Sequence, residues 1–139
     1  MPVQQIAVPD VVTCSPSDSL SDIVSTMESH DIGSIIVTEN DKPVGILTDR
    51  KIALACKDHE SLGSIHAEEL MTTSVETVSA DTGIFDVIRT LKENGVRRMP
   101  VVAEDGTLDG IVTFDDLVVL LADEFTDLSE IVRQQSQRF

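Results

Sequence analysis

The chain has 139 residues, of which 41% are hydrophobic, and its formal net charge at pH 7 is −15. This length and apolar content allow one compact domain or two small intertwined halves, and they exclude wholesale disorder. The negative charge excludes the basic face that nonspecific nucleic-acid binding needs. The sequence has no apolar run long enough to cross a membrane and no signal-peptide pattern, so we expect a cytoplasmic protein without membrane insertion.

Two further features of the composition limit the chemistry. Cys14 and Cys56 are too few for a disulfide framework and form no zinc-binding pattern with the three scattered histidines, so free thiols are expected. The acidic residues are spread along the chain rather than gathered in a tail. That pattern is typical of a halophilic source, but an ordinary acidic protein also shows it.

The first half of the chain predicts a strand, a helix, two strands and a second helix. Apolar residues from Leu20 to Met27 recur at helical spacing and would form one inward face, and Ile32 and Gly33 are expected to break that helix. The expected elements are a strand at 11–13, a helix at 20–29, a strand at 34–37, a turn at 39–42, a strand at 44–48, a helix at 50–57 and a linker at 58–66.

The second half predicts the same order of elements. Gly95 is expected to cap the end of the first helix in this half, and the Asp105–Gly106 pair predicts a tight turn. The expected elements are a short turn or helix at 67–71, a strand at 74–78, a helix at 81–94, a strand at 98–102, a turn at 104–107, a strand at 108–113 and a helix from about 115 to 135.

The last helix carries an apolar stripe that is longer than one small domain needs. Its residues recur at steps of three and four: Leu117, Leu121, Phe125, Leu128 and Val132. The stripe indicates either core packing against its own half of the chain or a contact with a second copy or another partner.

A short motif occurs twice, as GILT at 45–48 and GIVT at 110–113, and each copy leads into a predicted helix. A strand that runs into a helix start presents free N–H groups, which suit a phosphate, and Asp116 could accept hydrogen bonds from ribose hydroxyls. Thr-x-x-Asp is also an ordinary helix cap, and one copy alone would favour the cap. The repetition at an offset of about 65 residues favours a built site.

Three stretches in each half carry a resemblance to a known family. They are TCSP at 13–16, IGSIIV at 32–37 and GILTDR at 45–50 in the first half, and VETVSAD at 75–81, VRRMPVV at 96–102 and GIVTFDD at 110–116 in the second. The chain resembles a tandem pair of cystathionine-beta-synthase (CBS) domains, called a Bateman module. The resemblance implies an α/β (α+β) fold of two β-α-β-β-α repeats that pack through their sheets with pseudo-two-fold symmetry. We place repeat 1 at 1–62 and repeat 2, with an extended C-terminal helix, at 63–139.

In that family, clefts between the repeats bind adenosine compounds such as AMP, ADP, ATP or S-adenosylmethionine. The resemblance implies that Asp116 holds the ribose and that Ile111 lines the base pocket. It assigns the first cleft to Ile111, Thr113 and Asp116 of repeat 2 and to Gly33, Ser34 and Ile35 of repeat 1.

The second cleft departs from the family pattern because Lys51 stands where the ribose-binding acid is expected. A lysine cannot accept ribose hydroxyls, although it could reach a phosphate. Arg97 and Arg98 are either phosphate contacts of this cleft or a solvated pair at a strand end. The residues assigned to it are Ile46, Thr48, Lys51, Arg97, Arg98, Met99 and Pro100.

The sequence contains no nucleophile elbow, Walker loop or His-Glu-x-x-His motif, and adjacent acids such as Asp115 and Asp116 are more typical of a helix start than of a metal site. We therefore expect a non-enzymatic regulatory protein with no metal and no required cofactor. It would bind an adenosine-containing ligand and signal by changes in packing or partner contacts, as a homodimer and with an unidentified regulated enzyme or transporter. The alternative is a structural dimerisation module without a nucleotide.

Overall fold

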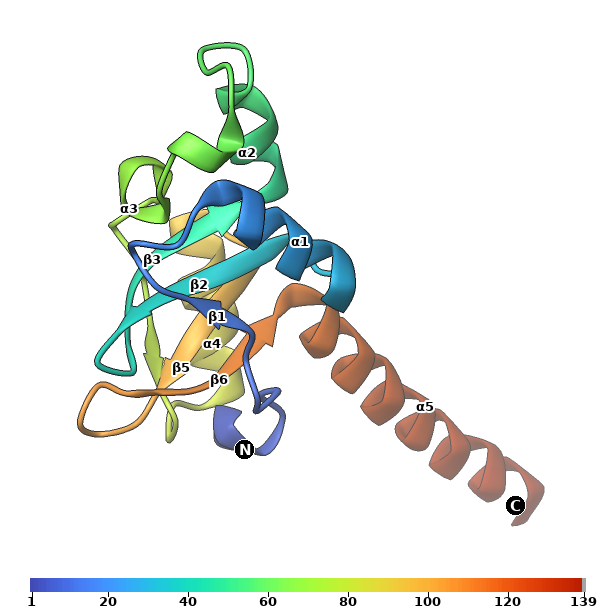
Figure 1. Ribbon diagram of the computed structural model, residues 1–139. Helices are drawn as coiled ribbons and strands as arrows, with labels where there is room; N and C mark the ends of the chain where they lie inside the picture. The colour runs from blue at the N-terminus through green and yellow to red at the C-terminus, as the bar shows by residue number, and fades with distance from the viewer. Residues whose placement is uncertain (139) are drawn as a thin grey trace.

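Each half of the chain forms its own three-stranded sheet (Figure 1). In the computed structural model, which describes residues 1–138, the first sheet has the order β1 (Thr13–Cys14), β2 (Ser34–Glu39), β3 (Lys42–Thr48), and the second has the order β4 (Val78–Ser79), β5 (Arg98–Val102), β6 (Leu108–Thr113). In both sheets the first pair of strands is parallel and the second is antiparallel. The predicted α/β fold with two like repeats is confirmed.

The helices begin and end with the local chemistry that their sequences predict. They are η1 (Val3–Gln5), α1 (Leu20–His30), α2 (Asp49–Ala55), η2 (Leu62–Ser64), α3 (Ala67–Leu70), α4 (Ile84–Asn94) and α5 (Phe114–Arg138). The hydroxyls of Ser19 and Thr48 accept backbone N–H groups in the first turns of α1 and α2. Gly95 caps α4 with φ +63°, as predicted. In α1 the residue in this left-handed conformation is Asp31, with φ +51°, rather than Gly33, because a short polar side chain also tolerates it.

Several expected elements are shorter than predicted. The strand expected at 74–78 is Val78–Ser79 and the one expected at 11–13 is Thr13–Cys14, so both begin and end later than predicted. The chain before β4 instead pairs with the far edge of β3, and the chain before β1 pairs with the far edge of β6. The helix expected from 81 begins at Ile84. Its predicted first turn is occupied by a tight turn in which Thr82 N–H donates to the Ser79 carbonyl at 3.0 Å.

The two apolar cores are completed by segments that lie outside the local repeat. The second core includes Val3, which is fully buried, and Val3 N–H donates to the Thr82 carbonyl at 2.7 Å. The first core includes Ile65, near the end of the expected linker, and Ala67, directly after it, and Thr72 pairs with Ile46 on β3. The N-terminal segment therefore packs on the second half, and the segment after the linker packs on the first.

Most of α5 extends away from the body of the molecule (Figure 1). Its first turns contribute Leu117 and, in part, Leu120 to the second core. Beyond them, Phe125, Leu128 and Val132 are exposed by 61–74%. Of the two interpretations of the apolar stripe, core packing therefore holds only for the start of the helix. Within the described residues, no helix combines the length and the apolar character that a membrane span requires.

Candidate ligand-binding cleft

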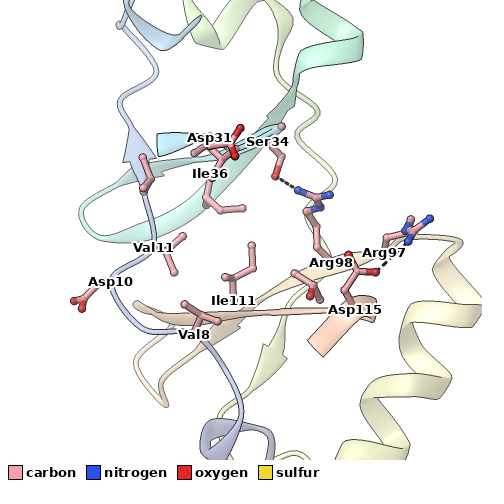
Figure 2. Close-up of a pocket in the computed structure, with 14 residues that line it drawn as sticks. Val8, Asp10, Val11, Asp31, Ser34, Ile36, Arg97, Arg98, Ile111 and Asp115 are labelled. Carbon is pink, nitrogen blue, oxygen red and sulfur yellow. Dashed lines mark hydrogen bonds and ion pairs between the residues drawn. The ribbon is translucent and has the colours of Figure 1, made fainter. Parts of the chain in front are cut away.

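A cavity of about 370 Å³ lies between the two halves of the chain, with walls from both repeats (Figure 2). This volume falls within the range of small-molecule sites, which is about 300–1,000 Å³. The lining residues from the first half are Val8, Asp10, Val11, Val12, Asp31, Ile32, Gly33, Ser34 and Ile36, and those from the second are Arg97, Arg98, Ile111, Thr113 and Asp115.

The wall from repeat 1 is formed where α1 ends and β2 begins. Gly33 and Ser34 line the cavity, as the resemblance implies. Ile35, assigned to the same wall, instead lies in the first apolar core with 1% of its surface exposed. Successive side chains of a strand point to opposite faces, so the neighbouring Ile36 lines the cavity in its place.

The wall from repeat 2 is formed by β6 and by the N-terminal segment that crosses it. Ile111 and Thr113 line the cavity, as expected. Val8 and Ile111 exchange backbone hydrogen bonds of 2.9 and 3.0 Å, which hold the crossing segment against the strand. Gly110 permits this approach, because a Cβ at that position would lie 3.0 Å from the Val8 carbonyl oxygen. The glycine of the repeated motif therefore makes room for backbone.

Two arginines border this cavity. Arg98 donates from Nη1 to Ser34 Oγ at 2.6 Å and so joins the two repeats across the cavity (Figure 2). Arg97 forms an ion pair with Asp115, with Nη2 and Oδ1 3.2 Å apart, and its guanidinium lies 5.0 Å from the centre of the Phe114 ring. The resemblance assigned both arginines to the second cleft, whereas the structure places them in the first.

Asp116, the expected ribose-binding acid, forms a reciprocal cap with Thr113. Its Oδ2 accepts from Thr113 Oγ1 at 2.8 Å and from Thr113 N–H at 3.2 Å, while Asp116 N–H donates to Thr113 Oγ1 at 3.1 Å. The capping interpretation of the motif is therefore realised here. Asp116 itself does not line the cavity, although Thr113 and Asp115, which precede it in the motif, do.

The residues assigned to the second cleft are in part drawn into other contacts. Thr48 Oγ1 accepts from Lys51 N–H at 3.2 Å, and the Lys51 ammonium donates to Thr72 Oγ1 at 3.0 Å. Met99 lies in the second core. Pro100 is fully buried, opposite Ile111 in the β5–β6 ladder. Ile46 pairs with Thr72 in the same way that Ile111 pairs with Val8, which preserves the pseudo-two-fold symmetry.

Several cavity residues were not predicted from the sequence. They are Val8, Asp10, Val11, Val12, Asp31, Ile32, Ile36 and Asp115. Asp10 and Asp31 both have left-handed backbone conformations, with φ of +57° and +51°. Aspartate is one of the residues that tolerate this conformation, and that tolerance is the only signal of these two positions that the sequence contains. Among residues 1–138, no three or more His, Cys, Asp or Glu side chains are grouped as a metal site.

Comparisons with known proteins agree with this architecture. A sequence profile of the CBS domain matches residues 3–58 and again residues 67–123. An uncharacterized protein of Methanopyrus kandleri, MK0525, is 34% identical over 118 residues, which are 84% of this chain and 60% of that protein. The CBS domain-containing protein YhcV of Bacillus subtilis is 32% identical over 109 residues, 78% of this chain and 77% of YhcV.

The solved CBS domain pair of protein MJ0100, a complex with 5′-methylthioadenosine and S-adenosyl-L-methionine, superposes with a TM-score of 0.77 at 25% identity, covering 89% of this chain and 98% of that one. The two profile matches include both sheets and every wall of the cavity described above. The chain therefore belongs to the CBS-domain family, as a pair of CBS repeats of the kind that forms a regulatory module.

Proposed function

We propose that this chain is a non-enzymatic regulatory protein that binds an adenosine-containing ligand in the cavity between its two repeats. The observation that carries the proposal is the shared construction of the cavity: Gly33, Ser34 and Ile36 form one wall, and Ile111 and Thr113 form the other. A ligand that contacts both walls favours one relative placement of the repeats, which is what a regulatory module requires.

The chemistry of the walls suits a nucleoside with an apolar base and polar sugar. Ile36 and Ile111 offer aliphatic surface for a flat base, and Thr113 offers a hydroxyl. The Asp116 carboxylate, which caps the helix through Thr113, would have to turn from this contact to accept ribose hydroxyls. The complex of the MJ0100 CBS pair with two adenosine derivatives supports this ligand class. AMP, ADP, ATP and S-adenosylmethionine are the candidates.

The charges near the cavity bear on how many phosphates the ligand carries. The cavity is lined by three acidic and two basic side chains, which are Asp10, Asp31, Asp115, Arg97 and Arg98. Arg97 is already paired with Asp115, and the whole chain carries a net charge of −15. Strong negative charge repels anions at long range, so a ligand with few phosphates or a cationic sulfonium fits this site better than ATP.

A thermal-shift screen with AMP, ATP, S-adenosylmethionine and NAD tests the proposal. A ligand that binds only the native state raises the unfolding temperature. At a concentration about one hundred times its dissociation constant, it raises the unfolding free energy by about 2.7 kcal/mol. We expect a shift with at least one adenosine compound. Absence of a shift with every compound at millimolar concentration would contradict the proposed ligand class.

A pair of symmetry-related variants locates the site. Ile111→Phe adds volume to the wall of the cavity and should abolish the ligand-induced shift. Ile46→Phe makes the same change at the corresponding position of β3, which the resemblance assigns to the second cleft, and should leave the shift intact. If Ile46→Phe abolishes the shift and Ile111→Phe does not, the ligand occupies the second cleft instead.

The alternative function, a structural dimerisation module without a nucleotide, is favoured by a different observation. The exposed apolar side chains of α5 are available for association whether or not the cavity is filled. This alternative predicts self-association of the ligand-free chain with no thermal shift for any nucleotide. Self-association together with a thermal shift on addition of a nucleotide would support the ligand-binding function and contradict this alternative.

A further inference from the structure

The exposed side of α5 follows a strict seven-residue repeat. Val118, Phe125 and Val132 are seven residues apart, and so are Phe114, Leu121 and Leu128. The two sets interleave at steps of three and four, as the a and d positions of a coiled coil do. An ordinary amphipathic helix drifts about 20° per heptad from this register, so an unbroken repeat over three heptads indicates a left-handed supercoil.

All six side chains of this heptad stripe are accessible. Phe114, Val118 and Leu121 are exposed by 40–47%, and the other three are exposed by 61–74%. The residues of α5 that pack on the body, Leu117 and Leu120, lie on a neighbouring side of the helix. The body covers the first part of the heptad stripe only in part and leaves Phe125, Leu128 and Val132 largely exposed, and contiguous apolar surface of this kind marks an association site.

The residues that flank the heptad stripe in the projecting part of α5 carry little charge. Ala122 and Ser129 occupy the e positions, and Glu124 and Ile131 occupy the g positions. In coiled coils between different chains, complementary charges at e and g select the partner. Of these four residues of α5, Glu124 is the one that carries a charge. A second copy of this chain supplies a matching heptad stripe without any need for such charges.

We propose that α5 pairs with α5 of a second copy as a parallel, two-stranded coiled coil through the heptad stripe. β-Branched residues at a with leucine at d favour two parallel strands, and Val118, Val132, Leu121 and Leu128 fit that rule. In this arrangement Glu124 faces Ser129 of the other copy, so no like charges meet at the flank. This proposal does not depend on the ligand-binding function, because it concerns the ligand-free chain.

The heptad stripe continues into the body of the molecule. A groove of about 360 Å³ between α4 and α5 is lined by Ile88, Leu91 and Val96 together with Phe114, Val118 and Leu121. Parallel pairing places the two bodies at the same end of the coil, where these grooves lie beside the shared seam. The start of the coil therefore buries apolar surface of the body as well as of the helix.

Sedimentation equilibrium of the full ligand-free chain tests the pairing. We expect a dimer for the wild type, and a rise of roughly a hundredfold or more in the dimer dissociation constant for the double variant Phe125→Glu/Leu128→Glu, which buries two charges in the seam. Val119→Glu is the matched control, because Val119 is 60% exposed on the same helix but outside the heptad stripe. A monomeric wild type, a stable trimer or tetramer, or equal losses in both variants would overturn the proposal.

Disulfide trapping tests the orientation. In a Cys56→Ser background, Leu128→Cys places the thiols of a parallel pair side by side at a d position, and mild oxidation should cross-link the dimer. Glu130→Cys, on the outer side of the coil, should remain uncross-linked under the same conditions. Equal cross-linking of both variants, or none at position 128 in a protein that sediments as a dimer, would overturn the parallel coil.

Discussion

Asp116 combines a structural role with the proposed contact to a ribose. Its carboxylate caps α5 through Thr113, with an Oγ1–Oδ2 distance of 2.8 Å. In repeat 1, Lys51 occupies the corresponding position, and Thr48 caps α2 without a reciprocal carboxylate. Both helices are therefore capped by a threonine hydroxyl, and only in the second repeat does a carboxylate three residues after that threonine bond back to it.

Two substitutions at Asp116 separate these roles. Asp116→Ala removes both, so the unfolding free energy should fall by about 1 kcal/mol and nucleotide affinity by about 10–100-fold. Asp116→Asn keeps an oxygen for Thr113 but loses the charge and one acceptor, so affinity should fall while stability stays close to wild type. Calorimetric titration and urea unfolding measure the two effects, and Lys51→Ala is the control with little expected loss. Equal affinity losses at Asp116 and Lys51 would mean that the competent cleft is assigned incorrectly.

Cys14 gives the protein a specific sensitivity to alkaline pH. Burial, and then the nearby Asp18 carboxylate, raise the pKa of its thiol from 9.0 to about 11. The folded state therefore keeps a proton that the unfolded state releases, so the unfolding free energy should fall as pH rises from about 9 to about 11, by at most about 2–3 kcal/mol.

Urea unfolding across this pH range measures the effect, and Cys14→Ala should remove that part of the decline. The exposed Cys56 provides the matched control, because Cys56→Ala should leave the decline unchanged. The chain contains no tyrosine, which simplifies the comparison. An unchanged decline in Cys14→Ala would show that another group is responsible.

At the scale of elements, each repeat is joined to a segment from outside it, at Val8 on β6 and at Thr72 on β3. On β6, Gly110 leaves the space that the crossing backbone needs. Gly110→Ala would bring a Cβ to 3.0 Å from the Val8 carbonyl oxygen and 3.2 Å from Ala7 Cβ. We expect a loss of about 1–3 kcal/mol in the unfolding free energy, because the backbone of the crossing segment must shift. Gly63→Ala, which meets only Ser61 Oγ at 3.6 Å, should be nearly neutral in urea unfolding.

The elements that the sequence predicted well are those set by neighbouring residues. The turn at Asn40 and Asp41, both with positive φ, and the glycine cap at Gly95 follow from local backbone preferences. The sequence could not separate Ile35 from Ile36, because four consecutive residues of β2 are buried and no alternation marks the cavity side. The position of Val3 in the second core depends on a contact across about 80 residues, which no local pattern contains.

At the scale of the whole molecule, one side chain connects the cavity with the proposed dimer interface. Arg97 lines both the cavity and the groove between α4 and α5. Its guanidinium pairs with Asp115 and lies over Phe114, the first residue of the heptad stripe, while its carbonyl accepts from Phe114 N–H at 2.7 Å. A ligand that moves Arg97 therefore acts directly on the start of α5.

We therefore expect nucleotide binding to alter α5 beyond the cavity. Coupling between two sites is typically about 1–3 kcal/mol, which corresponds to a change of roughly 5–150-fold in the dimerisation constant. Hydrogen exchange with and without nucleotide should show slower exchange around the cavity, at 31–36 and 111–116, and a change in α5 at 120–132. At a nucleotide concentration that saturates the variant, Arg97→Gln should weaken the change in α5 relative to the protection of the cavity, because it removes the ion pair with Asp115 and the contact with the Phe114 ring. If the cavity becomes protected while residues 120–132 do not change in the wild type, α5 does not transmit the signal, and its pairing is independent of the ligand.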